Sequence, residues 1–363
     1  MVKNLKDTFV PEYWKSTLAE VKETMDLVKK GKVSIKGYSA GGRPLYFVEY
    51  GESCLPAPKA SLSGALGSRD YKNFADKTSP DYVPTVCLMG AVHGGEWEGT
   101  VALNNLIKII ETGTDYKGDR HDELRELCSK VHLLIMPLCN PDGRERIPFK
   151  NFVGKTFEDL RYYNQGTWKN GELCGWPNCM KYHGITELCD FVGGYFNDNG
   201  VNFNNDNFFV DPQPETKTIL KLAQDYIPDI SLMLHGGDNC KGMFNPPRHT
   251  PNVSYVTMSL LGAYVKEKSA EAGYDFGYHD YKIGERESNR HVPSFGISSA
   301  YTHTCGEPCF IYESNQGLTE HPAGSLGQTN EEIFNRHMIL FKSTIEWILK
   351  IKSPMTAYME ERI

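Results

Sequence analysis

The sequence lacks the long apolar run that a membrane-spanning helix needs. Although 40% of its 363 residues are hydrophobic, no stretch approaches the roughly 18 to 20 consecutive apolar residues that cross a bilayer. The N-terminus has charged residues (Lys3, Lys6 and Asp7) where a secretory signal has its apolar segment. We therefore expect a cytoplasmic protein that does not bind membranes; an extracytoplasmic location would require that a signal has been removed.

Positive charge is also scarce. The 39 Lys and Arg residues face 46 Asp and Glu residues, so the net charge is −7. Nucleic-acid binding needs a concentrated positive surface, so no nucleic-acid partner is expected. Ten cysteines spread over a chain of this length are too sparse for a disulfide scaffold, which favours reduced thiols.

Two catalytic signatures are missing as well. The chain has no Gly-x-Ser-x-Gly elbow of a serine hydrolase and no glycine-rich phosphate loop that ends in Lys-Ser or Lys-Thr. Serine hydrolases and nucleotide-dependent enzymes of these types are therefore disfavoured.

The apolar pattern predicts an α/β fold. A helical period covers Pro11 to about Lys30 and residues 100–112 and 331–351, and a strand pair is expected at 33–38 and 45–50. Short apolar runs at 83–89, 131–138, 227–234 and 308–312 are typical of buried parallel strands. No linker or repeat divides the chain. We expect a three-layer α/β/α sandwich with a mixed, largely parallel sheet.

The domain organisation follows from the same pattern. Residues 1–32 are expected to form a helical segment packed on a catalytic domain at 33–363. That domain carries a loop-rich insertion at about 144–200, and a second long loop is expected at 240–300.

Polar side chains follow four of the apolar runs. They are His93 and Glu96, then Asn140 and Asp142, then His235, and finally Glu313. In open α/β sheets, the functional crevice lies at the carboxyl ends of the strands. Taken singly, His235 could be a buried histidine, Glu313 an ion-pair partner and residues 140–143 a simple turn, whereas Gly94, Gly95 and Glu96 beside His93 favour a functional role for that residue.

Three of these residues are candidate metal ligands. Imidazole nitrogens and a carboxylate oxygen suit Zn²⁺, and a catalytic zinc site offers three protein ligands with a fourth position for water. His93 and Glu96 lie three residues apart in a turn, and His235 can complete the set from a neighbouring strand.

The ordered set of motifs resembles the zinc metallocarboxypeptidases of the M14, or funnelin, family. The family's His-x-x-Glu pattern is matched by residues 93–96 and its Asn-Pro-Asp-Gly turn by residues 140–143. Its Gly-x-Asp-x-Asn-Arg-Asn segment is similar to residues 200–206. Matches in the same order extend from about residue 37 to about 316.

The resemblance implies one zinc ion per chain, held by His93, Glu96 and His235. It also implies that Glu313 is the general base. A carboxylate that removes a proton from metal-activated water and passes it to the leaving amine agrees with this assignment. Asp142 is expected to orient His93.

Further roles are implied less directly. An arginine after the Asn-Pro-Asp-Gly turn would stabilise the oxyanion, and Arg146 is preferred to Arg144. The family's substrate-side tyrosine corresponds to His291 in a gapless count, with Tyr301 and Tyr281 as other options.

One departure concerns the substrate carboxylate. Asn204 and Asn205 occupy the positions of the Asn-Arg pair with which the family binds that group. An asparagine lacks the charge and the bidentate fork of arginine. Arg248, Arg286 or Arg290 could supply recognition from another loop.

The expected activity is zinc-dependent hydrolysis of amide bonds, as in a carboxypeptidase that removes C-terminal residues from peptides. Within the same fold, the alternative is an amidase or deacylase acting on cell-wall peptides or acylamino acids. A different class of function is an inactive binding protein that keeps the metal. The oligomeric state is left open.

Overall fold

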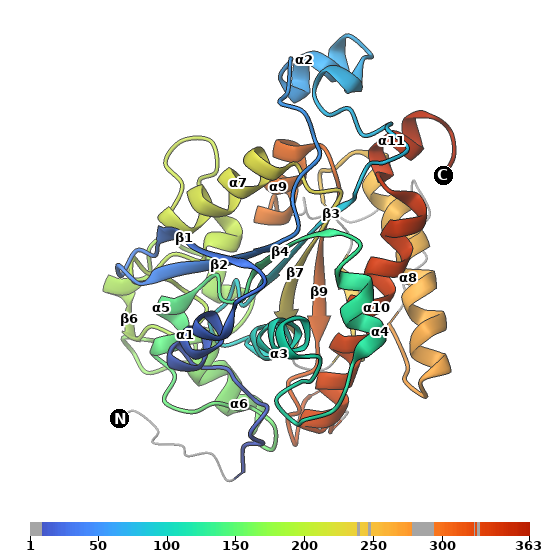
Figure 1. Ribbon diagram of the computed structural model, residues 1–363. Coiled ribbons are helices and arrows are strands. Elements are labelled where there is room, and N and C mark those ends of the chain that lie inside the picture. The colour runs from blue at the N-terminus through green and yellow to red at the C-terminus, as the bar shows by residue number, and fades with distance from the viewer. Residues whose placement is uncertain (1–8, 238–239, 246–247, 278–293, 323, 325–326) are drawn as a thin grey trace.

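A seven-stranded sheet forms the centre of the protein (Figure 1). The structure is a computed structural model that describes residues 9–237, 240–245, 248–277, 294–322, 324 and 327–363. The strand order is β1-β2-β4-β3-β7-β9-β8. The strands are β1 (Lys32–Tyr38), β2 (Pro44–Tyr50), β3 (Thr85–Gly90), β4 (His132–Met136), β7 (Ile230–Gly236), β8 (Met243–Asn245) and β9 (Cys309–Ser314).

The sheet is mixed but parallel at its centre. β4, β3, β7 and β9 run parallel to one another, whereas β1 and β2 at one edge and β8 at the other are antiparallel to their neighbours. The strand pair and the four buried strands predicted from the sequence are therefore confirmed, with boundaries shifted by a few residues.

Helices cover both faces of the sheet (Figure 1). One face carries α3 (Glu98–Thr112), α8 (Asn252–Glu271) and α10 (Asn330–Ile351), and the other carries α7 (Pro214–Tyr226) and α9 (Ile297–Cys305). Side chains along β3 alternate between the two cores: Val86 and Leu88 face the first, whereas Cys87 and Met89 face the second. The expected three-layer α/β/α sandwich is confirmed. In the described residues, no helix is long and apolar enough to cross a bilayer.

The first helix is shorter than predicted. α1 spans Leu18–Leu27, and Thr17 begins it through a capping box: the Thr17 hydroxyl accepts from the Glu20 amide at 3.3 Å, and the Glu20 carboxylate accepts from the Thr17 amide at 3.0 Å. Trp14, which contributed to the helical period, is buried before the helix begins and donates its indole N–H to the Lys150 carbonyl at 2.9 Å. Trp14 is therefore buried without being part of the helix.

The prediction of a long loop at 240–300 is largely wrong, because this segment contains α8 and the start of α9. The small polar residues Ser254 and Thr257 are buried in α8 beside Met258, Leu261 and Val265. Hydroxyl side chains at core positions interrupt the apolar period that sequence analysis relies on. α7 and the short α11 (Pro354–Met359) were also not predicted.

Residues 144–200 form only short elements. These include α6 (Phe157–Leu160), β5 (Thr167–Trp168) and β6 (Cys189–Phe191), and the last two make a separate two-stranded sheet. Cys174, Cys179 and Cys189 are buried in the small core of this segment. All ten cysteines of the chain are free thiols in the structure.

Candidate metal centre and active site

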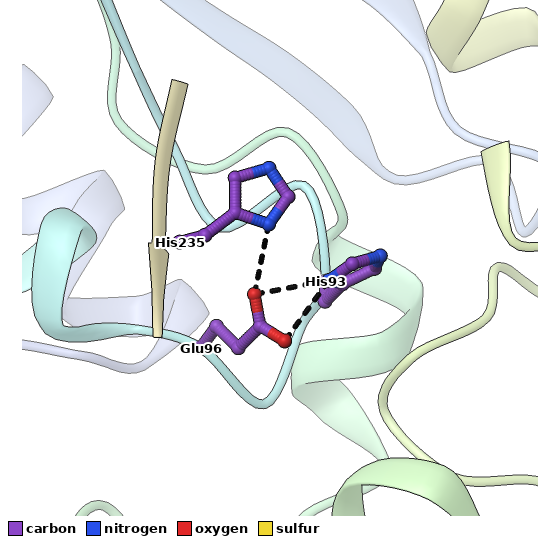
Figure 2. Close-up of side chains that lie close together, drawn as sticks. All are labelled: His93, Glu96 and His235. Atoms are coloured by element: carbon purple, nitrogen blue, oxygen red, sulfur yellow. Dashed lines mark hydrogen bonds and ion pairs between the residues drawn. The ribbon is translucent and has the colours of Figure 1, made fainter. Parts of the chain in front are cut away.

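Two neighbouring strands bring His93, Glu96 and His235 together. β3 and β7 are parallel partners with Gly90 opposite Leu234, so the turn after β3 lies beside the end of β7. The Nδ1 atom of His93 lies 2.9 Å from Glu96 Oε1, and Nδ1 of His235 lies 3.0 Å from Glu96 Oε2 (Figure 2). One candidate ligand atom from each residue lies within 4.8 Å of the others.

This donor set fits a single zinc ion. Zinc–ligand bonds of roughly 2.0 to 2.2 Å in a tetrahedral site place ligand atoms about 3.4 Å apart, so small side-chain shifts would open the observed contacts to that spacing. All three residues are buried, and among the described residues they are the one group with this arrangement. Two imidazoles and one carboxylate leave a fourth position for water.

The carboxylate of the cluster is ionised, as a metal ligand must be. Burial alone would raise the pKa of Glu96. The charge on His93, with hydrogen bonds from His235 and His93, outweighs burial and lowers this pKa to about 2.

Two residues orient the His93 ring on the side away from Glu96. Its Nε2 atom lies 3.1 Å from Asn202 Oδ1, and its ring stacks on Tyr195 with a centroid separation of 3.5 Å. If Nδ1 of His93 binds a metal, the hydrogen on Nε2 would be donated to the Asn202 oxygen. Asn202 and Tyr195 therefore fix the tautomer and the plane of this ligand.

Glycines allow the turn that holds two of the ligands to pack closely. A Cβ on Gly94 would lie 2.2 Å from the Arg144 amide nitrogen, and one on Gly143 would lie 2.1 Å from the Gly194 carbonyl oxygen. Any side chain at these two positions would push the segments apart, which explains why glycine stands in both motifs.

Glu313 lies next to the cluster on β9. It is in register with His235 on the neighbouring parallel strand, so both side chains project from the same side of the sheet. Its Oε1 accepts a hydrogen bond from the Asn245 amide on β8 at 2.7 Å. This contact joins the side chain of Glu313 to the neighbouring edge strand.

The cluster and Glu313 line one cavity of about 550 Å³. Its wall also includes Asn204, Asn205 and Arg248. A cavity of this size admits part of a peptide.

The model of a family described as zinc carboxypeptidase matches residues 17–271. The chain belongs to the zinc carboxypeptidase family. A search of curated proteins finds no match.

Solved structures share this fold. The metallo-carboxypeptidase from Burkholderia cenocepacia is 15% identical, with 92% of this chain and 68% of that chain covered and a TM-score of 0.55. Bovine thrombin-activatable fibrinolysis inhibitor, in complex with tick carboxypeptidase inhibitor, is 13% identical, with 93% and 99% covered and a TM-score of 0.52. At these identities, the likeness concerns the fold.

The two arginines expected to stabilise the oxyanion do not line the cavity. The guanidinium of Arg144 is buried and donates to the backbone carbonyls of Ser16, Ile147 and Phe149. Arg146 likewise donates to two backbone carbonyls and also pairs with Asp198 at 2.7 Å. Both arginines stabilise the loop after β4, so the oxyanion role expected from the family pattern does not fit them.

Of the other residues predicted to bind substrate, some line the cavity and others do not. Asn204 and Asn205 line the cavity as expected. Tyr301 does not, because it is fully buried in the core between α9 and the sheet. His291 and Tyr281 lie outside the described residues, as do Arg286 and Arg290.

The prediction that Asp142 orients His93 is also wrong. Asp142 is fully buried and accepts hydrogen bonds from Ser39, the Gly41 amide and Arg43. It therefore ties the loop between β1 and β2 to α5 (Pro141–Glu145), and Asn202 takes the role beside His93.

Sequence reasoning missed two further residues of the site. Tyr195 lies on a loop without periodicity, and only its place after Gly193 and Gly194 marks it as unusual. Asn245, the hydrogen-bond partner of Glu313, ends a three-residue strand that gives no apolar signal.

Proposed function

We propose that this protein is a zinc-dependent peptidase that hydrolyses an amide bond near the carboxyl terminus of a peptide. The arrangement of His93, Glu96 and His235 beside Glu313 in one cavity carries the proposal. Membership in the zinc carboxypeptidase family supports it. We further propose that the three clustered residues are the zinc ligands.

The chemistry follows from the positions of these residues. Bound zinc would lower the pKa of a coordinated water to about 7 and polarise the scissile carbonyl. Glu313 would accept the proton of that water and deliver it to the leaving amine nitrogen. The hydrogen bond from Asn245 holds one Glu313 oxygen, which fixes the direction in which the other oxygen approaches the substrate.

Substitution of Glu313 tests this mechanism. Glu313→Gln keeps an acceptor for Asn245 but removes the base, so kcat should fall about 10²- to 10⁴-fold on a hydrolysed peptide. Zinc content, measured by elemental analysis, should stay at one ion per chain. Glu172→Gln, at an exposed residue whose carboxylate contacts Asn170, is the matched control.

Removal of zinc provides a second test of the same proposal. A chelator should abolish hydrolysis, and added Zn²⁺ should restore it. Unchanged turnover in Glu313→Gln, or full activity in the chelated protein, would contradict the proposal. If wild-type protein with one zinc per chain cleaves no peptide in a broad panel, the inactive binding protein becomes the better interpretation.

A further inference from the structure

The segment at residues 144–200 contributes a buried amide to the metal cluster. Asn164 belongs to η2 (Arg161–Gln165), a single turn of π-helix that follows α6. Its side-chain Nδ2 donates to Glu96 Oε1 at 3.4 Å, and the residue is buried in the wall of the same cavity. Single π-helical turns are frequent at functional sites.

A metal-bound Glu96 needs donors other than the two histidines. Nδ1 of His93 and Nδ1 of His235 lie 2.9 and 3.0 Å from its oxygens. An imidazole nitrogen that binds a metal does so through its lone pair and carries no hydrogen, so neither nitrogen can then donate to the carboxylate. Among the described residues, the donors that remain are Asn164 on Oε1 and the Gly236 amide on Oε2, the latter at 3.3 Å. Asn164 is the side-chain donor of the two.

The donor matters because Glu96 is buried. A buried carboxylate oxygen without a donor is strongly disfavoured, and a hydrogen bond to a charged group is stronger than one between neutral groups. By holding Oε1, the Asn164 amide limits rotation of the carboxylate and keeps the group in place beside His93 and His235.

Asn164 is itself held next to the ligands. Its backbone carbonyl accepts from the Tyr195 amide at 2.7 Å, and the Tyr195 ring stacks on His93. A Cβ on Gly95 would lie 2.3 Å from Asn164 Oδ1, so the Asn164 side chain packs directly on the turn that follows His93. The position of the Asn164 amide relative to this turn is therefore fixed by both backbone and side-chain contacts.

We propose that Asn164 is a positioning residue that holds Glu96 in place for zinc, which makes the segment at residues 144–200 a part of the metal site. The inference rests on the proposed function, because it takes His93, Glu96 and His235 as the zinc ligands. In this role, Asn164 acts through Glu96 and not on the substrate.

Two substitutions separate the hydrogen bond from packing. Asn164→Leu removes the amide but keeps a branched side chain, whereas Asn164→Ala removes both. Zinc affinity, measured by competition against a calibrated chelator, should fall about 10- to 100-fold in both variants. Asn178→Leu and Asn178→Ala are the matched controls, at an exposed asparagine of the same segment outside the cavity wall, and should bind zinc like wild type.

Thermal unfolding separates this role from a merely structural one. A structural loss would lower the melting temperatures of the metal-free and the zinc-loaded protein alike. Loss of a positioning contact should instead reduce the increase in melting temperature that zinc produces, because weaker binding stabilises the folded state less. Equal increases in wild type and in both Asn164 variants would overturn the proposal.

Hydrogen exchange provides an independent readout. Coupling between two sites is reciprocal, so if Asn164 strengthens zinc binding, zinc must stabilise the turn that contains Asn164. Amide exchange at residues 161–165 should therefore slow when zinc is added to wild type, and the effect should be smaller in Asn164→Leu. An effect of the same size in both proteins would contradict the proposal.

These measurements also separate the inference from the proposed function. Zinc binding that weakens in both Asn164 variants supports the inference even if wild type cleaves no peptide, in which case the proposed function alone fails. Equal zinc affinity in wild type and Asn164→Leu overturns the inference even if hydrolysis is normal. A wild-type protein that binds no zinc would overturn both.

Discussion

Asn202 contacts two polar groups of the site at once. Its side-chain oxygen lies 3.1 Å from both His93 Nε2 and the Asn204 amide nitrogen. The same oxygen that begins the short helix η5 (Phe203–Asn205) therefore also orients a candidate metal ligand. At the scale of the residue, a capping role and a role in the metal site are compatible.

Loss of the Asn202 side chain should weaken the metal site. Asn202→Ala leaves the buried His93 N–H without its acceptor, so zinc affinity should fall about 10- to 100-fold. Competition against a calibrated chelator measures this. The exposed Asn207→Ala is the matched control, and equal zinc affinities in the two variants would contradict the orienting role of Asn202.

His337 gives the protein a pH dependence far from the site. It is fully buried on α10, contacts the Ile333 carbonyl through Nδ1 at 2.8 Å, and lies against Tyr312. Burial lowers its pKa to about 4 from the usual 6.5. The unfolded chain therefore binds a proton more readily than the folded protein does between these two values.

Stability should consequently fall as the pH is lowered from 6.5 to 4. The contribution of His337 is present above pH 6.5 and is lost by pH 4, which amounts to about 3 kcal/mol. Urea unfolding at pH 7.0 and pH 4.5 measures the change. His337→Gln, which does not titrate, should lose less stability than wild type, and parallel losses would show that His337 is not responsible.

At the scale of elements, the site depends on how closely backbone segments approach. The turn after β3 packs against the start of α5 at Gly94 and Gly143, and α3 approaches β7 where Gly99 meets Leu234. The sheet supplies the direction of each ligand, whereas these close approaches determine whether the ligands share one ion.

Gly94→Ala should therefore disturb the metal site without removing a ligand. The added methyl group would meet the Gly143 and Arg144 backbone at less than 2.5 Å, so we expect a loss of about 1 to 3 kcal/mol in stability and weaker zinc binding. Thermal unfolding with and without zinc measures both effects. Gly67→Ala on α2 (Leu62–Gly67), where the methyl group meets nothing within 4 Å, should change neither.

At the scale of the whole molecule, a buried cluster of charged residues lies at the end of the sheet opposite the candidate metal site and joins several chain segments there. Lys77 pairs with Asp229 at 2.9 Å and with Glu307 at 3.1 Å, and all three side chains are fully buried. Asp229 also accepts from the Thr85 amide, and Glu307 accepts from the Met355 amide on α11. The cluster thus connects the segment before β3, the starts of β7 and β9, and the C-terminal helix.

Lys77→Met should destabilise the protein strongly. It leaves two buried carboxylates without their cation, for which we expect a loss of about 3 to 5 kcal/mol at pH 7. Burial raises the pKa of both Asp229 and Glu307, so the folded variant binds protons more tightly than its unfolded chain. The loss should therefore shrink as the pH falls, and chemical denaturation at several pH values measures it.

The exposed Lys72→Met, in the same segment, is the control and should unfold like wild type. A loss in Lys77→Met that does not change with pH would show that the missing packing, and not the unpaired carboxylates, causes the destabilisation.

The sequence by itself determined the α/β class, the four central strands, and the residues at their carboxyl ends that form the candidate site. These features follow from short-range patterns: continuous apolar runs mark buried strands, and the polar residue that follows a parallel strand is directed to one edge of the sheet. Where hydroxyl residues occupy core positions, as in α8, the pattern disappears and the helix was missed.

Only the tertiary structure decided the roles of the charged residues. Arg144, Arg146 and Arg248 are identical in chemistry, yet two are bound by backbone carbonyls and one lines the cavity. The same holds for Asp142 and Asn202: Asp142 contacts the loop between β1 and β2, whereas Asn202 contacts His93. The reason is physical: a polar side chain acts on whatever segment the fold packs against it, and those partners lie tens to hundreds of residues away in the sequence.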